Sequence, residues 1–268
     1  MIAEFFKHIT TSAPEYVKKM GYLREILSIE ARYKRFKIDW DRHLNNSKEV
    51  ILDALKMASG NKRIVVLGSG LLIDLPLNVI SQRFDDVVLV DIIHLPQVED
   101  VVKVYDNVRL ISADITSVAQ RLFITKPLPN TQLPREQPFL PECNDGCDMV
   151  ISLNILSQLP VIPVNYLVDK LGWEYGDMLT KWENYLMSSH LNALLNLSCP
   201  VCLISDWELT YLDKDDVEIE RHLTAPVLSE IQPYRQWFWR IAPFGGESKQ
   251  YSVELTVGAY LFDNKKRL

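Results

Sequence analysis

The sequence contains little that fits a membrane protein or a secreted, disulfide-bonded protein. Only four of the 268 residues are cysteines, too few for a disulfide framework in a chain of this length. No apolar run reaches the roughly 18 residues that a membrane-spanning helix needs. Glu4 and Lys7 interrupt the N-terminal segment, so we expect no signal peptide. These absences predict a cytoplasmic protein with no membrane partner.

Positive charge is also in the minority. The chain has 29 Lys and Arg against 35 Asp and Glu, a formal net charge of -6. Proteins that bind nucleic acid neutralise phosphates with basic side chains, so we expect a small-molecule partner rather than a nucleic acid. Cys199 and Cys202 have the spacing of a zinc or redox pair, but no Cys- or His-rich cluster accompanies them. We therefore expect no metal.

Apolar strand patterns alternate with helical patterns from residue 60 onward. They occur at residues 63–67, 87–92, 108–115, 147–154 and 200–206. Continuous apolar strands separated by helices indicate a parallel sheet with helices on both faces. Two further strand patterns, at 236–242 and 251–262, indicate a hairpin. The sequence thus predicts an α/β fold: a mostly parallel, Rossmann-like sheet of seven strands that ends in an antiparallel hairpin.

The chain divides into two predicted parts. Residues 1–59 are dominated by helical patterns and predict an N-terminal helical cap, and residues 60–268 predict one Rossmann-like domain. Two stretches of that domain do not fit the regular alternation of strands and helices, and we interpret them as insertions. The first, about 126–146, has too many prolines for a helix or a central strand, and the second spans about 157–197.

One helix of the cap has clear predicted ends. Apolar residues recur at helical spacing from Val50 to Ala58. Asn46, followed by Glu49, is typical of a capped start, and Gly60 is typical of a C-terminal cap. We therefore predict a helix over about 47–59.

The first predicted strand leads into a glycine turn. Gly68, Ser69 and Gly70 follow the apolar run directly, and Asp74 precedes a predicted helix over 75–84. Glycines let the backbone turn sharply and let a ligand approach it, and a helix N-terminus offers free N–H groups. Such a turn on its own is as often structural as ligand-binding.

Two acidic residues follow at the ends of the next two predicted strands. Asp91 lies at the carboxyl end of the second strand, 23 residues after Gly68, and Asp114 lies at the carboxyl end of the third, 23 residues after Asp91. A carboxylate after the second strand can accept hydrogen bonds from ribose hydroxyls. Since the carboxyl ends of parallel strands lie at one edge of the sheet, the turn and both carboxylates predict a nucleoside site there.

This order of motifs resembles that of the class I S-adenosylmethionine-dependent methyltransferases. Gly68-Ser69-Gly70, Asp91, "SADIT" (112–116) and "DMVISLN" (148–154) look like motifs one to four of that family. The resemblance covers roughly residues 60–262 and includes the terminal hairpin. The usual third glycine would fall at Leu72, within Leu71-Leu72-Ile73.

The resemblance implies a role for each motif, with S-adenosylmethionine as the cofactor. Gly68, Ser69 and Gly70, with Asp74 after them, would lie against its methionine part. Asp91 would hold the ribose hydroxyls with Ile92 beside it, and Asp114 would face the adenine amino group. Ile115 would pack near the adenine ring, and Leu153 and Asn154 would border both the cofactor and the substrate pocket.

The implied activity is methyl transfer to a small or medium organic acceptor. His94, His43 and Asn154 are the candidates for a catalytic group, because the two histidines flank the expected mouth of the site and Asn154 borders it. One alternative is an NAD-binding Rossmann protein, although Ile73 stands where that fingerprint has Gly or Ala. Another is a non-catalytic binding or partner protein that keeps the fold.

Overall fold

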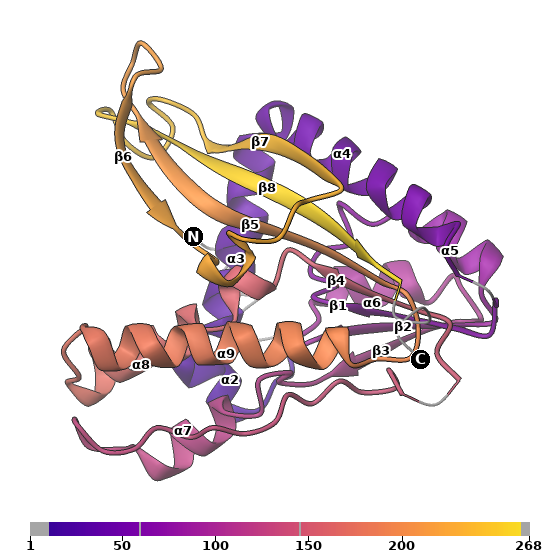
Figure 1. Ribbon diagram of the computed structural model, residues 1–268, viewed down its shortest axis with the longest axis horizontal. Helices are drawn as coiled ribbons and strands as arrows, with labels where there is room; N and C mark the ends of the chain where they lie inside the picture. The colour runs from indigo at the N-terminus through magenta and orange to yellow at the C-terminus, as the bar shows by residue number, and fades with distance from the viewer. Residues whose placement is uncertain (1–10, 59, 145, 264–268) are drawn as a thin grey trace.

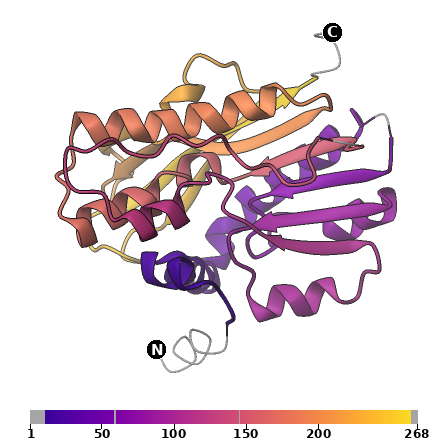
Figure 2. The same cartoon turned by 90° about the horizontal axis from the view of Figure 1, so that it is seen from below.

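The structure, a computed structural model, describes residues 11–58, 60–144 and 146–263. A twisted sheet of eight strands forms its centre, with helices on both faces (Figures 1 and 2). Seven strands lie in the order β3-β2-β1-β4-β5-β8-β7, and β6 pairs with β5. The strands are β1 (Arg63–Leu67), β2 (Asp86–Asp91), β3 (Val108–Ser112), β4 (Met149–Leu153), β5 (Val201–Leu212), β6 (Glu218–Leu223), β7 (Arg235–Ala242) and β8 (Ser252–Phe262).

The helices are α2 (Glu15–Met20), α3 (Tyr22–Arg35), α4 (Lys37–Leu55), α5 (Leu77–Arg83), α6 (Pro96–Val102), α7 (Ala119–Thr125), α8 (Val161–Leu171) and α9 (Asp177–Leu195), with 3-10 turns η1 (Leu156–Gln158) and η2 (Pro226–Leu228). The longest of these are α4 and α9, with 19 residues each, and the three helices α5, α6 and α7 have seven residues each. None of the helices in the described part of the chain is long and apolar enough to cross a bilayer.

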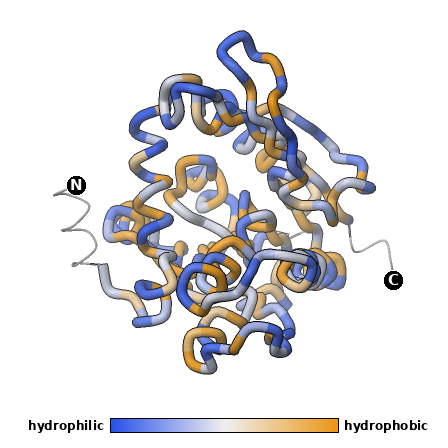
Figure 3. Tube along the Cα trace, turned by 90° about the vertical axis from the view of Figure 1, so that its left-hand side faces the viewer, coloured by the Kyte–Doolittle hydropathy of each residue, from blue (hydrophilic) through white to orange (hydrophobic). Residues whose placement is uncertain are grey.

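Alternate residues of the buried strands point to opposite faces of the sheet, so each strand contributes to two apolar layers. On one face, Val66 packs in a cluster with residues of α4 and α5. On the other, Val65 packs in a cluster that includes Leu191 of α9. Figure 3 shows mainly hydrophilic residues on the outer turns, including the tip of the projecting β5–β6 hairpin.

The predicted fold class is confirmed. β3, β2, β1, β4 and β5 pair in parallel, and β8 pairs antiparallel with both β5 and β7. The strand count differs by one, because β6 was not predicted. All six residues of β6 are exposed, so this strand has no buried face to impose an apolar pattern.

The first helix prediction has the wrong ends. α4 begins at Lys37, ten residues before the predicted start, and ends at Leu55. Asn46 does not cap it: this residue lies inside the helix, and its Oδ1 accepts a hydrogen bond from Arg235 on β7 (2.8 Å). Gly60 lies beyond the helix end, where a Cβ atom would meet the Asp148 carboxylate at 2.2 Å. Each of these two residues is placed by a tertiary contact and does not cap the helix.

The helix predicted at 75–84 is shorter than expected. α5 begins only at Leu77, after Pro76, and no side chain caps it. Asp74 lies three residues earlier, and its Oδ2 accepts a hydrogen bond from Asn154 (2.7 Å) instead. The carboxylate therefore bridges to the end of β4 rather than opening the helix.

The N-terminal helices cover two parts of the sheet. α4 lies along β7, and α2 and α3 pack over the segment that follows β2, where Leu23 and Ile26 contact Ile93 and Leu95. The division into a cap at 1–59 and a domain at 60–268 remains an interpretation. Of the predicted insertions, 126–146 is irregular where described, and 157–197 carries η1, α8 and α9.

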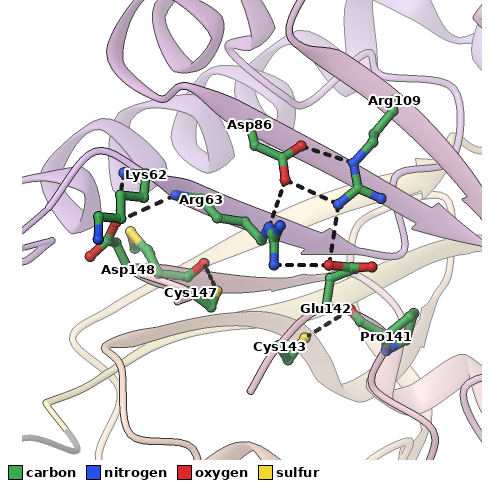
Figure 4. A network of polar contacts seen from close by, with 10 residues as sticks. Lys62, Arg63, Asp86, Arg109, Pro141, Glu142, Cys143, Cys147 and Asp148 are labelled. Atoms are coloured by element: carbon green, nitrogen blue, oxygen red, sulfur yellow. Dashed lines mark hydrogen bonds and ion pairs between the residues drawn. The ribbon is translucent and has the colours of Figure 1, made fainter. Parts of the chain in front are cut away.

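A network of ion pairs fastens the amino ends of the first three strands (Figure 4). Asp86, at the start of β2, accepts from Arg63 of β1 (2.6 Å) and Arg109 of β3 (2.9 Å). Glu142 closes the network with ion pairs to the same two arginines (2.8 and 3.3 Å). Its side chains are partly buried, so these pairs are screened less than exposed ones.

We expect Asp86→Asn to destabilise the fold by about 1–2 kcal/mol, because two arginines lose a charged acceptor. The hydrogen bonds from Arg109 and Arg63 lower the pKa of Asp86 below its ordinary 3.8. The stabilisation is therefore complete above that pH and is lost as pH falls through the lowered pKa. Urea unfolding at several pH values measures both effects.

The matched control is Asp100→Asn on α6, whose pair with Lys103 is exposed. We expect no measurable change in the free energy of unfolding, as for many exposed pairs. An equal loss in both variants, or a pH dependence unchanged in Asp86→Asn, would contradict the importance of the network.

Candidate functional site

A cavity of about 270 Å³ opens at the carboxyl ends of the parallel strands. The strand order reverses between β1 and β4, which pair in parallel. Open α/β sheets bind ligands at such a reversal, outside the carboxyl ends of the strands. Gly68 after β1 and Asn154 after β4 border the cavity from its two sides.

The cavity brings together most of the residues singled out from the sequence. Those that line it are Gly68, Gly70, Asp74, Asp91, Ile92, Asp114, Ile115, Leu153, Asn154 and His43. Ser69 and His94 do not line it. The lining shows that these residues share one location. Their individual roles in cofactor binding stay predictions.

The glycine turn is held by backbone contacts. Gly68 has a φ of 81°, and a Cβ atom there would lie 2.6 Å from the carbonyl oxygen of Leu153. Gly70 has a φ of 48° and open space where a Cβ would be. Its N–H donates to the Asp91 carboxylate (2.8 Å). Gly68 is thus required by close packing, while Gly70 leaves the backbone accessible.

The three bulky residues after the turn do not close the cavity. Leu72 packs against the core cluster that contains residues of α4 and α5, and it does not line the cavity. Leu71 and Ile73 line the cavity, and each also packs against a different apolar cluster. Leu72 has a φ of 62°, so a leucine holds the left-handed conformation that glycine adopts most easily.

Asp91 is anchored at the end of β2. One carboxylate oxygen accepts from the Gly70 N–H and the other from the Ile92 N–H, both at 2.8 Å. Burial raises the pKa of Asp91, and these hydrogen bonds only partly offset the rise. Each carboxylate oxygen can accept more than one hydrogen bond, so Asp91 can also accept from a ligand.

Asp114 is engaged by its own loop. Its Oδ1 accepts from the N–H and hydroxyl of Thr116 (2.9 and 2.5 Å), and its Oδ2 accepts from the N–H of Ala119 (2.8 Å). The carboxylate thereby organises the turn that leads into α7. Asp114 also lines the cavity, so this local role and ligand contact can coexist.

His43 reaches the cavity from α4, but its ring is fixed by tryptophans. Its Nδ1 lies 3.1 Å from Nε1 of Trp237, and its ring stacks on Trp239 at 3.8 Å. An indole N–H can only donate, so Nδ1 accepts and Nε2 carries the proton. The contact of Nε2 with Nδ2 of Asn154 (3.3 Å) therefore joins two donors and is not a hydrogen bond.

Burial lowers the pKa of His43 to about 3. The imidazole is thus a neutral wall of the cavity and a poor proton acceptor. Asn154 directs its amide N–H to Asp74 instead, as described above, and burial raises the pKa of Asp74.

His94 lies beneath the glycine turn. Its Nε2 is 3.4 Å from the Ser69 hydroxyl, and its Nδ1 is 3.2 Å from the Ser112 hydroxyl. Burial lowers its pKa to about 4. The ring connects the turn to the end of β3, which gives His94 a supporting position in the structure.

The structure adds Asp206 of β5 to the site. This residue lines the cavity with only 4% of its surface exposed. Its Oδ1 accepts from the Ser157 hydroxyl (2.6 Å), and burial raises its pKa. Asp206 ends the apolar run 200–206, so the rule that selected Asp91 and Asp114 would have found it. Tyr22 and Glu25 of α3 also line the cavity, and no sequence motif indicates them.

The four cysteines do not contribute to this cavity. All four cysteines are buried and none lines the cavity. Over residues 11–58, 60–144 and 146–263, no group of three or more His, Cys, Asp or Glu side chains is arranged to hold a metal ion.

No family model and no curated protein matches the chain. Among solved structures, it is similar to DhpI in complex with S-adenosylhomocysteine, at 12% identity over 89% of this chain and 94% of that one, with a TM-score of 0.39. It is also similar to the N-methyltransferase NodS of Bradyrhizobium japonicum, again as an S-adenosylhomocysteine complex, at 9% identity over 81% and 86%, with a TM-score of 0.38.

A third similar structure is 1,6-didemethyltoxoflavin-N1-methyltransferase of Burkholderia thailandensis, at 11% identity over 88% of this chain and 90% of that one, with a TM-score of 0.36. At these identities and TM-scores the likeness concerns the fold.

We expect glycine to be more stabilising than alanine at position 72, the reverse of the usual order. Both variants lose the leucine's packing, but only alanine keeps the cost of a left-handed backbone, about 1 kcal/mol. The free energy of unfolding measured in urea should therefore be about 1 kcal/mol higher for Leu72→Gly than for Leu72→Ala.

Ile80 of α5 gives the control, because its helical backbone favours alanine over glycine by about 1 kcal/mol. If the alanine variant is the more stable one at both positions, 72 and 80, the turn at Leu72 is not strained.

We expect His43 to remain neutral with its proton on Nε2 between about pH 5 and 8, the range in which histidines ordinarily titrate. Two-dimensional ¹⁵N–¹H NMR of the imidazole reports the tautomer directly. Trp237→Phe removes the indole donor and should populate the Nδ1–H form. A wild-type ring protonated on Nδ1, or one that titrates in this range, would contradict the assignment.

Proposed function

We propose that the chain is an S-adenosylmethionine-dependent methyltransferase that acts on a small organic acceptor. The observation that supports this most is the meeting of three features at one cavity. The glycine turn after β1, Asp91 at the end of β2 and Asp114 after β3 all line it. Their order along the chain and their positions at the strand ends are those that the resemblance to the methyltransferase family requires.

The residues present fit the cofactor. Gly70 exposes backbone without a side chain, which suits the methionine part. Asp91 is rigidly oriented by two backbone N–H groups and keeps acceptor capacity for ribose hydroxyls. Ile92 and Ile115 supply apolar walls beside the two carboxylates, which suits an adenine ring.

S-adenosylmethionine, when bound, supplies a methyl group on a sulfonium that is transferred in an in-line displacement. The chain's contribution to such a step is to orient the acceptor and to exclude water. α3 covers the cavity with Ile26 and Ile29, and Trp40 and Trp239 close it from α4 and β7. The walls are therefore largely apolar and aromatic.

The size of the cavity favours a small acceptor. Its volume of about 270 Å³ is near the lower end of ligand pockets, roughly 300–1,000 Å³. The nicotinamide alternative gains no support from Asp114, and a non-catalytic binding protein remains the competing interpretation.

Isothermal titration calorimetry tests the proposal. We expect the folded protein to bind S-adenosylhomocysteine, and Asp91→Ala and Asp91→Asn to weaken binding about tenfold or more, ~1.4 kcal/mol. Asp100→Asn on exposed α6 should leave binding unchanged. Binding of NAD in place of S-adenosylhomocysteine would favour the Rossmann alternative, and binding of neither by folded wild type would overturn the proposal.

A further inference from the structure

The polar part of the cavity wall is acidic. Five carboxylates line it: Glu25, Asp74, Asp91, Asp114 and Asp206. Among the described residues that line it, Arg32 is the one Lys or Arg, and it pairs with Glu247 at 2.7 Å. An acceptor that carries a carboxylate or phosphate would therefore meet repulsion from the five carboxylates, because the one cation of the wall is already paired.

Asp206 is the one buried carboxylate among these five, and the other four are half-buried. Asp91 and Asp114 each have both oxygens engaged by backbone N–H groups. Asp206 has one engaged oxygen, Oδ1, while Oδ2 is buried without a hydrogen-bond partner. The Thr224 hydroxyl interacts with this carboxylate and lowers its pKa, but it is outside hydrogen-bonding geometry of Oδ2, and burial still raises the pKa of Asp206 overall.

A short chain of hydrogen bonds orients this carboxylate. The Gln158 amide donates to the Ser157 hydroxyl (3.1 Å), which donates to Oδ1 of Asp206 (2.6 Å). A buried acceptor oxygen without a donor is destabilising by about 1–3 kcal/mol. A ligand that brings an N–H or an ammonium group to Asp206 would remove this cost.

Asn154 offers a second acceptor at the same cavity. Its amide N–H donates to Asp74, and its Oδ1 is buried without a partner. Asp206, within β5, and Asn154, directly after β4, lie on adjacent strands, and the Asn154 N–H donates to the carbonyl oxygen of Ile204 (2.8 Å). An ammonium group carries several N–H donors and can satisfy two oxygens at once.

From this arrangement we infer that the methyl acceptor is an amine, with Asp206 as the group that binds its nitrogen and takes its proton. The methyl-transfer part rests on the function proposed above. The ammonium gives one proton to the Asp206 carboxylate, and the freed lone pair forms the N–C bond. The C–S electron pair returns to sulfur, so a sulfonium and an ammonium become a thioether and a methylated ammonium. The Asp206 proton then passes to water.

The histidines do not compete for this role. His43 lines the cavity, but its Nδ1 accepts from Trp237 and its Nε2 carries a proton. His94 and His190 do not line the cavity, and each contacts a serine hydroxyl instead. The free oxygen of Asp206 is the buried proton acceptor that this wall provides.

Calorimetry with matched probes tests the inference on the full chain saturated with S-adenosylhomocysteine. Each probe set has one carbon skeleton: ethylamine, ethanol and acetate, and benzylamine, benzyl alcohol and benzoate. In at least one set we expect the amine to bind about tenfold or more tightly than its alcohol and acid. Asp206→Asn should remove this preference. Glu208→Gln, a buried carboxylate two residues along β5 that does not line the cavity, should keep it.

A second measurement does not depend on the folding of the variant. In wild-type protein labelled with ¹³C at the aspartate carboxyl carbons, the preferred amine should shift the Asp206 resonance and leave that of exposed Asp215 in place. No amine preference in either set, a preference that survives in Asp206→Asn, or an unmoved Asp206 resonance would overturn the inference.

The same titrations without S-adenosylhomocysteine separate the two proposals. If the wild type prefers amines through Asp206 but binds no S-adenosylhomocysteine, the amine site stands and methyl transfer fails. If it binds S-adenosylhomocysteine but shows no amine preference, the methyltransferase proposal stands and the acceptor class is wrong.

Discussion

The close approach of the Gly68 turn to the end of β4 is the constraint on which the site depends. A Cβ atom at Gly68 would lie 2.6 Å from the Leu153 carbonyl oxygen and 2.9 Å from Cβ of Ile155. The chain can therefore leave β1 beside β4 only with glycine at this position. The turn then brings the Gly70 N–H to Asp91, which ties the reversal in strand order to the end of β2.

The electrostatics of the cavity follow from how its carboxylates are satisfied. Backbone N–H groups, not cations, hold Asp91 and Asp114. Burial raises the pKa of Asp74, Asp91 and Asp206, as expected for carboxylates removed from water without a positive partner. The same burial keeps His43 neutral. The cavity is thus rich in acceptors, and a cationic ligand would complement it.

The sequence predicted the parts of this structure that repeat a strong pattern. Apolar strands and the residues at their carboxyl ends were readable, because parallel strands bury both faces and end at a common edge. Asp91 and Asp114 were found in this way, and Asp206 was open to the same reasoning. β6 was missed because both of its faces are exposed.

Tertiary contacts explain the remaining errors. Asn46 and Asp74 resemble helix caps in sequence, yet they bond to Arg235 and Asn154, which lie 189 and 80 residues away along the chain. The covering of the cavity by α3 depends on how α2 and α3 pack beyond β2, which no local motif records. The left-handed backbone of Leu72 was likewise hidden, because only the surrounding packing holds a leucine there.

If the turn after β1, Asp91 at the end of β2 and Asp114 after β3 form one nucleoside site, a single ligand should contact all three. Two-dimensional ¹⁵N NMR during addition of S-adenosylhomocysteine measures this in solution. We expect the amide signals of Gly68, Gly70, Ile92 and Ile115 to shift together in one saturable transition, while those of the exposed strand β6 stay in place. Unchanged signals in these residues, or shifts confined to another part of the sheet, would contradict a single nucleoside site.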